Sequence, residues 1–114
     1  MRKLTELEIK KALKTLDGWV LKEGKLCSEF VFEDFKAAFA AMTEIALHAE
    51  EIQHHPEWCN VYNKLEIHLF THDIQGLSML DIQLATVINA MGRNYKVKRI
   101  APETVNASLF PCSK

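Results

Sequence analysis

Several features that mark particular protein classes are scarce or absent in this sequence of 114 residues. Only three cysteines occur, at positions 27, 59 and 112, and their odd number and irregular spacing argue against a disulfide framework. We therefore expect reduced thiols. No apolar run reaches the roughly 18 residues of a membrane-spanning helix, and no apolar signal core follows the N-terminal residues. These absences predict a protein of the cytoplasm, with the nucleus as the alternative, and no contact with a membrane.

An excess of one charge sign is also missing. The 14 Lys and Arg residues stand against 15 Asp and Glu residues, for a formal net charge of -1. This balance argues against a surface that binds nucleic acid directly. The phosphate loop and the motifs G-x-G-x-x-G and G-x-S-x-G do not occur either. Nucleotide-dependent transfer and serine hydrolysis therefore have no support in the sequence.

The sequence does contain the patterns of one compact α+β domain. Capping pairs, Thr5 with Glu8 and Ser78 with Asp81, indicate the starts of the first and last helices. Residues 65–70 alternate between apolar and polar side chains, which is typical of a strand with one face in the core. The predicted order is a helix over 5–17, strands over 19–21 and 26–32, a helix over 33–52, strands over 60–63 and 65–70, and a helix after residue 78. With hairpin connections, this order predicts a two-layer α+β fold in which a four-stranded antiparallel sheet carries three helices on one face.

The helix predicted over 33–52 has more apolar surface than one contact needs. Phe35 and Phe39 follow helical spacing together with Met42, Ile45, Ala46 and Ala49. Alanines at positions 37, 38, 40 and 41 widen the apolar surface beyond one stripe. We expect such a helix to pack on two partners, the sheet on one side and a second subunit on the other.

The C-terminal stretch differs from the rest of the chain. It contains Pro102 and Pro111, several polar residues and only isolated apolar ones. We predict a folded domain over residues 1–95 and a C-terminal tail over residues 96–114 that is partly ordered at best.

Three histidines are the strongest functional signal. His54 and His55 precede Pro56 where the long helix gives way to a strand, and His72 follows the next strand. If the two strands pair as a hairpin, His72 is carried back toward the histidine pair. Imidazole changes its charge near neutral pH, so a cleft with three imidazoles could both donate and accept protons.

Three interpretations of these histidines remain open from the residues alone. The first is that they are ordinary solvated or core histidines, which we favour for His48 and His68. The second is a zinc site with an open position, although the spacing matches no H-x-x-x-H or H-E-x-x-H pattern. The third is acid–base catalysis without a metal, in which one imidazolium donates a proton and a neutral imidazole accepts one.

Four neighbouring residues could belong to the same site, and each has an ordinary alternative. Glu50, on the last turn of the long helix, could orient a histidine or could be a solvated surface residue. Asp81 could face inward or could serve only as a helix cap. Trp58 could offer a flat face to a ring-shaped ligand or could belong to the core. Cys59 as a nucleophile is the weaker hypothesis, because cysteines at strand starts are usually buried and inert.

The chain resembles a known family over residues 4–95. The resemblance rests on the motif H-H-P-x-W-x-N-V-Y-N, residues 54–63, followed by T-H at positions 71 and 72. It continues through G-L-S at 76–78 and Asp81, and it includes F-x-F-x-x-F at 30–35. This sequence is similar to the pterin-4a-carbinolamine dehydratases, which are also known as dimerisation cofactors of a homeodomain transcription factor. Residues 96–114 have no counterpart in the resemblance.

The resemblance implies a specific chemistry and specific residues. It implies a lyase that removes water from 4a-hydroxytetrahydropterin to give quinonoid dihydropterin, which recycles the pterin cofactor of aromatic amino acid hydroxylases. It implies that neither a metal nor an organic cofactor is needed, and that the subunits form homodimers or homotetramers. A transcription-factor partner, with the chain acting as a coactivator, is the alternative role. The family's histidines match His54, His55 and His72, and its acidic residues match Glu50 and Asp81.

Overall fold

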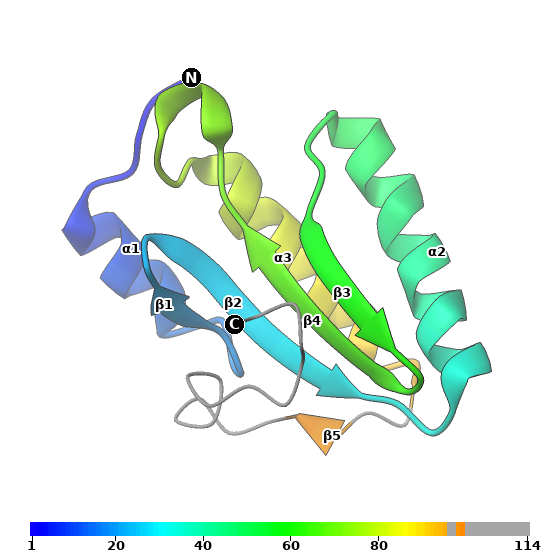
Figure 1. Ribbon diagram of the computed structural model, residues 1–114. Coiled ribbons are helices and arrows are strands. Elements are labelled where there is room, and N and C mark those ends of the chain that lie inside the picture. Colours follow the sequence, from blue (N-terminus) through cyan, green and yellow to red (C-terminus); the bar gives the residue numbers. More distant parts are fainter. Residues whose placement is uncertain (96–97, 100–114) are drawn as a thin grey trace.

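The computed structural model describes residues 1–95 and 98–99 of the chain. Figure 1 shows the helices packed on one face of an antiparallel sheet, which confirms the predicted α+β fold. The elements in chain order are α1 (Glu6–Leu13), β1 (Val20–Lys22), β2 (Lys25–Val31), α2 (Phe35–Ile52), β3 (Glu57–Val61), β4 (Lys64–Leu69), the 3-10 helix η1 (His72–Ile74), α3 (Met79–Gly92) and β5 (Lys98–Arg99).

The sheet consists of two hairpins that meet at their longer strands. The strand order is β1-β2-β4-β3, so β2 and β4 lie at its centre and pair from Leu26↔Leu69 to Val31↔Lys64. The hairpin turn between β1 and β2 has positive φ at Glu23 and Gly24, as a two-residue turn that follows the twist of the sheet requires. The two-residue strand β5 pairs with β2 as a fifth strand that the sequence patterns did not predict. The remainder of the predicted tail over 96–114 lies outside the described residues, so the domain boundary stays a prediction.

The core lies between the sheet and the helices. Alternate residues of β2 and β4 point into it and are fully buried, among them Leu26, Leu65 and Ile67. The capping pairs Thr5 with Glu8 and Ser78 with Asp81 both form in the structure, so the predicted helix starts are confirmed. Among the residues that the structure describes, no helix is long and apolar enough to cross a bilayer.

The structure decides which of the apolar surfaces of α2 packs on the sheet. Ala38, Ala41 and Ile45 are buried in the core, whereas Phe35 and Phe39 are about half exposed. Small alanine side chains let the helix approach the sheet closely, which leaves the bulky rings outside. The alanine-rich surface therefore forms the contact with the sheet, and the phenylalanines form the second apolar surface.

Strand β3 also begins earlier than predicted, at Glu57 rather than at residue 60. Pro56 stands just before the first residue of the strand, where its missing N–H removes no bond from the ladder. The turn to β4 lies at Tyr62 and Asn63, and Tyr62 has a φ of 53°. As a consequence, Glu57 lies opposite His68, and Trp58 lies opposite Ile67.

The sheet face turned away from the helices is not the solvated surface that its polar residues suggested. Cys27, Glu29 and Glu66 on this face are all buried. Cys27 is a free thiol, whereas Cys59 is disulfide-bonded, so the expectation of reduced thiols is wrong for Cys59. Sequence spacing alone could not show this, because pairing depends on how closely the fold brings two Cα atoms together.

Candidate active site

The candidate site lies at one end of the sheet. In Figure 1 the end of α2, the start of β3, the end of β4 and the start of α3 all lie at this end. Helix α2 ends at Gln53, whose backbone is left-handed, with φ 54° and ψ 43°. The next backbone N–H, from His54, donates to the carbonyl of Ala49 over 3.0 Å. This C-cap ends the helix and lets the chain turn so that His54 is buried.

His54 is held by a buried carboxylate. Its Nε2 lies 2.6 Å from Oδ1 of Asp81, which is fully buried. The second oxygen of Asp81, Oδ2, accepts a hydrogen bond of 2.7 Å from the Thr71 hydroxyl and one of 2.9 Å from the backbone N–H of Ser78. With Asp81 as the acceptor, Nε2 of His54 carries a proton. The ring is therefore fixed in orientation, and its Nδ1 is the nitrogen left for other chemistry.

Asp81 thus performs both roles that the sequence had left open. It is the N3 residue of a capping box with Ser78 at the start of α3. The same side chain orients His54, a residue 27 positions earlier in the chain. A carboxylate near a helix N-terminus also interacts favourably with the positive end of the helix dipole.

The second histidine of the pair has a different environment. His55 Nε2 lies 2.6 Å from Oε2 of Glu50, which is on the last turn of α2. Both side chains are exposed. Both alternatives that the sequence left open for Glu50 therefore hold, because it contacts a histidine, His55, and is itself exposed to solvent. Adjacent residues after the C-cap point to opposite environments, so His54 is buried and His55 faces solvent.

His72 reaches the same end of the sheet from β4. The preceding residue, Thr71, donates to Asp81, so the His54 and His72 segments are joined through one carboxylate. The His72 ring packs edge-on against Phe70, with ring centroids 5.1 Å apart. The structure therefore joins the His54 and His72 segments through Asp81, while His55 is paired with Glu50.

Trp58 lies on β3 and is half buried against the apolar core. It stands opposite Ile67, which points toward the helices. The sequence had left two alternatives for Trp58, a contact with a ring-shaped ligand or a place in the core. The structure packs it against the core.

Two polar groups near the site were missed by the sequence interpretation. Glu57 accepts a hydrogen bond of 2.7 Å from Lys25, and its other oxygen lies 3.8 Å from His72 Nε2. The Lys25 hydrogen bond is the main reason why the pKa of Glu57 is lowered. A strand predicted to begin at Glu57 would have indicated this contact, because Glu57 then pairs with β4, which leads into His72.

The other missed group lies on the buried sheet face. His68 Nδ1 is 3.1 Å from the Cys27 sulfur, and its Nε2 contacts Oε1 of Glu66. His68 is therefore half-buried with two polar partners, which agrees with the expectation of an ordinary solvated or core histidine. Within residues 1–95 and 98–99, no group of three or more His, Cys, Asp or Glu side chains is arranged to hold a metal ion.

Cys27 allows a test of this buried face by pH. Burial raises the pKa of the Cys27 thiol to about 11. In the unfolded chain the thiol ionises at lower pH, so its contribution to stability is full at pH 8 and is lost as the pH rises from about 9 toward 11. Comparing urea unfolding of the wild type with that of Cys27→Ala, we expect the stability difference to shrink by about 2 kcal/mol across this range. A difference that stays constant from pH 8 to 11 would contradict the burial of a neutral thiol.

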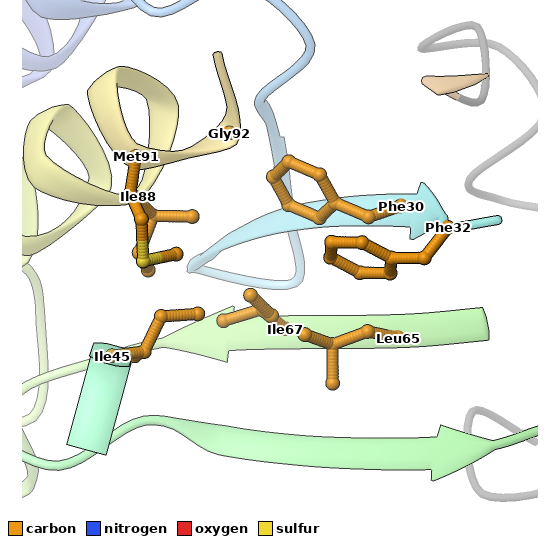
Figure 2. A pocket seen from close by; sticks show the side chains of 8 residues that line it. All are labelled: Phe30, Phe32, Ile45, Leu65, Ile67, Ile88, Met91 and Gly92. Carbon is orange, nitrogen blue, oxygen red and sulfur yellow. The ribbon is translucent and has the colours of Figure 1, made fainter. Parts of the chain in front are cut away.

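The pocket drawn in Figure 2 lies within the core rather than at the histidines. It is formed between the sheet and the helices α2 and α3, and the labelled side chains converge on it without a polar group among them. Its lining consists of Phe30, Phe32, Ile45, Leu65, Ile67, Ile88, Met91 and Gly92. It therefore offers no acid–base chemistry, which leaves the histidine end of the sheet as the candidate site.

Comparisons with known proteins point to one family. The family model described as "Pterin 4 alpha carbinolamine dehydratase" matches residues 2–91. A protein of Christiangramia forsetii named "Putative pterin-4-alpha-carbinolamine dehydratase" is 50% identical over 88 residues, which are 77% of this chain and 91% of the relative. One with the same name from a Synechococcus strain is 53% identical over 77 residues, 68% of this chain and 83% of the relative. A crystal structure from Brucella melitensis is described as a transcriptional coactivator/pterin dehydratase. It aligns with a TM-score of 0.77 and 42% sequence identity, and the alignment covers 79% of this chain and 98% of the Brucella chain.

Proposed function

Because this chain belongs to the pterin-4a-carbinolamine dehydratase family, we propose that it removes water from 4a-hydroxytetrahydropterin to give quinonoid dihydropterin. In this role it acts as a lyase that recycles the pterin cofactor of aromatic amino acid hydroxylases. The observation that carries the proposal is the buried pair of His54 and Asp81, joined through Thr71 to the His72 segment, within a sequence that matches the family.

The reaction requires two proton transfers. The substrate carries a hydroxyl on carbon 4a and a proton on the adjacent ring nitrogen. Loss of water needs an acid to protonate the leaving hydroxyl and a base to remove the nitrogen proton, and each positioned group typically contributes about 10²–10⁴-fold. The scheme needs no metal and no organic cofactor.

We assign these transfers to His54 and His72, without assigning acid and base between them. Asp81 orients His54 by accepting its Nε2 proton, in the manner of the third member of a catalytic triad. His55, paired with Glu50 at the surface, would hold the substrate or share the acid role. Trp58 would act from the core side as a wall of the pterin pocket.

The test is direct turnover. The purified full chain should accelerate the dehydration of synthetic 4a-hydroxytetrahydropterin over the rate in buffer, when product is followed by its absorbance. An unchanged rate with the folded protein at micromolar concentration would refute the proposed activity. A chain that acts only as a binding partner of another protein would give this negative result together with a stable heteromeric complex on size exclusion.

A second copy of this chain is the proposed occupant of the outer face of α2, defined here by Phe35, Phe39 and Leu47. All three side chains are about half exposed or more, and the two phenylalanine rings lie 5.8 Å apart. Exposed apolar surface of this kind, rimmed by polar residues, is typical of protein interfaces. The formal net charge of -1 adds little repulsion between copies. We therefore expect homodimers or homotetramers.

Replacing one residue of the outer face should separate the subunits. In Phe39→Glu a carboxylate would have to be buried at the interface, so we expect the dissociation constant to rise at least about tenfold. Light scattering after size exclusion measures the mass across a dilution series. Leu7→Glu is the matched control, because Leu7 is equally apolar and 69% exposed but lies on α1. Equal masses for both variants and the wild type would contradict this interface.

A transcription-factor partner is the alternative occupant of the same face. The Brucella melitensis structure carries the description of a coactivator as well as of a dehydratase. If such a partner binds here, Phe39→Glu would abolish its binding and leave turnover intact, because Phe39 lies near the start of α2 and the candidate site lies at the end of that helix. The cytoplasmic location, with the nucleus as the alternative, stays a prediction.

A further inference from the structure

The backbone of Thr71 closes the loop that carries His72. The N–H of Thr71 donates to the carbonyl of Gly76 over 2.9 Å, and the N–H of Gly76 donates back to the carbonyl of Thr71 over 3.4 Å. Inside this loop the Gln75 side chain donates to the backbone carbonyl of His72 over 2.8 Å. The position of the His72 backbone is therefore set by a closed loop that begins at Thr71.

The side chain of Thr71 points to the other histidine segment. Thr71 is only 7% exposed, and its hydroxyl donates to Oδ2 of Asp81 over 2.7 Å. The other oxygen of Asp81 is the one that holds Nε2 of His54. The Ser78 hydroxyl lies 2.8 Å from the Thr71 oxygen. Because a hydroxyl has one proton and Thr71 uses its proton on Asp81, Ser78 is the donor to Thr71.

These hydrogen bonds consequently run in one direction, from the start of α3 toward the carboxylate that holds His54. The N–H of Leu80 donates to the Ser78 hydroxyl oxygen over 3.3 Å, Ser78 donates to Thr71, and Thr71 donates to Asp81. Hydrogen bonds that follow one another in this way polarise each other, so the Thr71 hydroxyl becomes a stronger donor. Thr71, Ser78 and Asp81 are all buried, so water cannot readily replace a lost donor.

We propose that Thr71 is a positioning residue for both imidazoles. Its hydroxyl holds the Asp81 carboxylate in the orientation that fixes His54, and its backbone begins the loop that places His72. This inference rests on the function proposed above and deepens it, because it assigns the means by which two distant segments keep a fixed geometry. The sequence motif contains Thr71 without giving it a role.

Thr71→Val tests the hydroxyl with little change of shape. Valine keeps the branched Cβ, which suits the extended backbone of residue 71, with φ -107° and ψ 99°. We expect the rate at saturating substrate to fall at least about tenfold, because a misplaced catalytic group slows the chemical step. KM should stay within about threefold of the wild-type value. Thr71→Ser, which keeps the hydroxyl, should recover most of the rate.

A second measurement follows the positioning without substrate. Nuclear magnetic resonance of the isotope-labelled full-length protein detects the proton on Nε2 of His54, which should exchange slowly with water because it is buried against Asp81. In Thr71→Val this exchange should be at least about tenfold faster, since the local opening costs less. The backbone amide resonance of His72 should also shift. Sucrose, which strengthens the folded state, keeps a destabilised variant folded during these measurements.

Thr86→Val is the matched control for the same chemical change. Its hydroxyl donates to the carbonyl of Ile82 on the exposed side of α3. Its loss should leave turnover, the exchange at His54 and the resonance of His72 unchanged.

The outcomes separate the role of Thr71 from the proposed function. Wild-type turnover and wild-type exchange at His54 in folded Thr71→Val would overturn the positioning role. So would a Thr71→Ser variant as slow as Thr71→Val, because the effect would then belong to the methyl group. A wild-type chain without turnover would overturn the proposed function, whereas the exchange at His54 would still decide whether Thr71 holds the carboxylate and the ring in place.

Discussion

His54→Ala and His72→Ala should each slow dehydration by about 10²–10⁴-fold under single-turnover conditions, which is the usual contribution of a positioned acid or base. Each replacement removes one of the two proton transfers that the loss of water requires. Substrate binding should change less than the chemical step, because other residues of the site are untouched. The loss should therefore be found mainly in the rate at saturating substrate.

Two controls keep this result interpretable. His48→Ala removes an exposed imidazole from α2 away from the site and should retain the wild-type rate. His54→Gln keeps a hydrogen-bond donor for Asp81, so it should be folded even if His54→Ala is destabilised by the carboxylate left behind. Near-wild-type rates in His54→Gln and His72→Ala, with folding intact, would refute the assignment of these two residues.

Asp81→Asn should lower both stability and activity. The Asp81 carboxylate is fully buried and receives contacts from His54, from the Thr71 hydroxyl and from the backbone of Ser78. An amide keeps its oxygen on Thr71 and Ser78 only if its NH2 group faces His54, and Nε2 of His54 must then accept, so the network loses its charged acceptor and the imidazole is forced into the other tautomer. We expect the free energy of unfolding to fall by about 2–4 kcal/mol, because breaking a buried charged network costs more than losing an exposed contact.

Urea unfolding measures this loss, and Asp73→Asn is the matched control. Asp73 is an exposed carboxylate on η1, close to Asp81 in sequence, and its replacement should change stability by less than about 0.5 kcal/mol. Under conditions where Asp81→Asn is folded, its turnover should still be reduced at least tenfold, because His54 is no longer held in one orientation. A variant with wild-type stability would show that the buried network contributes little.

Much of the fold could be predicted because its signals are local. The capping pairs at Thr5 and Ser78 span only three residues, and the alternation over residues 65–70 lies within one strand. The orientation of α2 was not predictable in this way. Several of its faces are apolar, and only close packing against the sheet selects the alanine face over Phe35 and Phe39.

For the candidate site, the sequence by itself determined which side chains carry the chemistry: the two histidines before Pro56, the one after Thr71, and the acids at positions 50 and 81. Tertiary structure alone decided their partners. It joined His54 to Asp81 across 27 residues, and it brought Lys25, Glu57 and His72 together from three separate elements. These pairings depend on strand register and on where α2 ends, and a one-residue shift in register would turn each strand side chain to the other face of the sheet. The sequence states which side chain stands at each position, whereas the distance between two side chains depends on how all the helices and strands pack together.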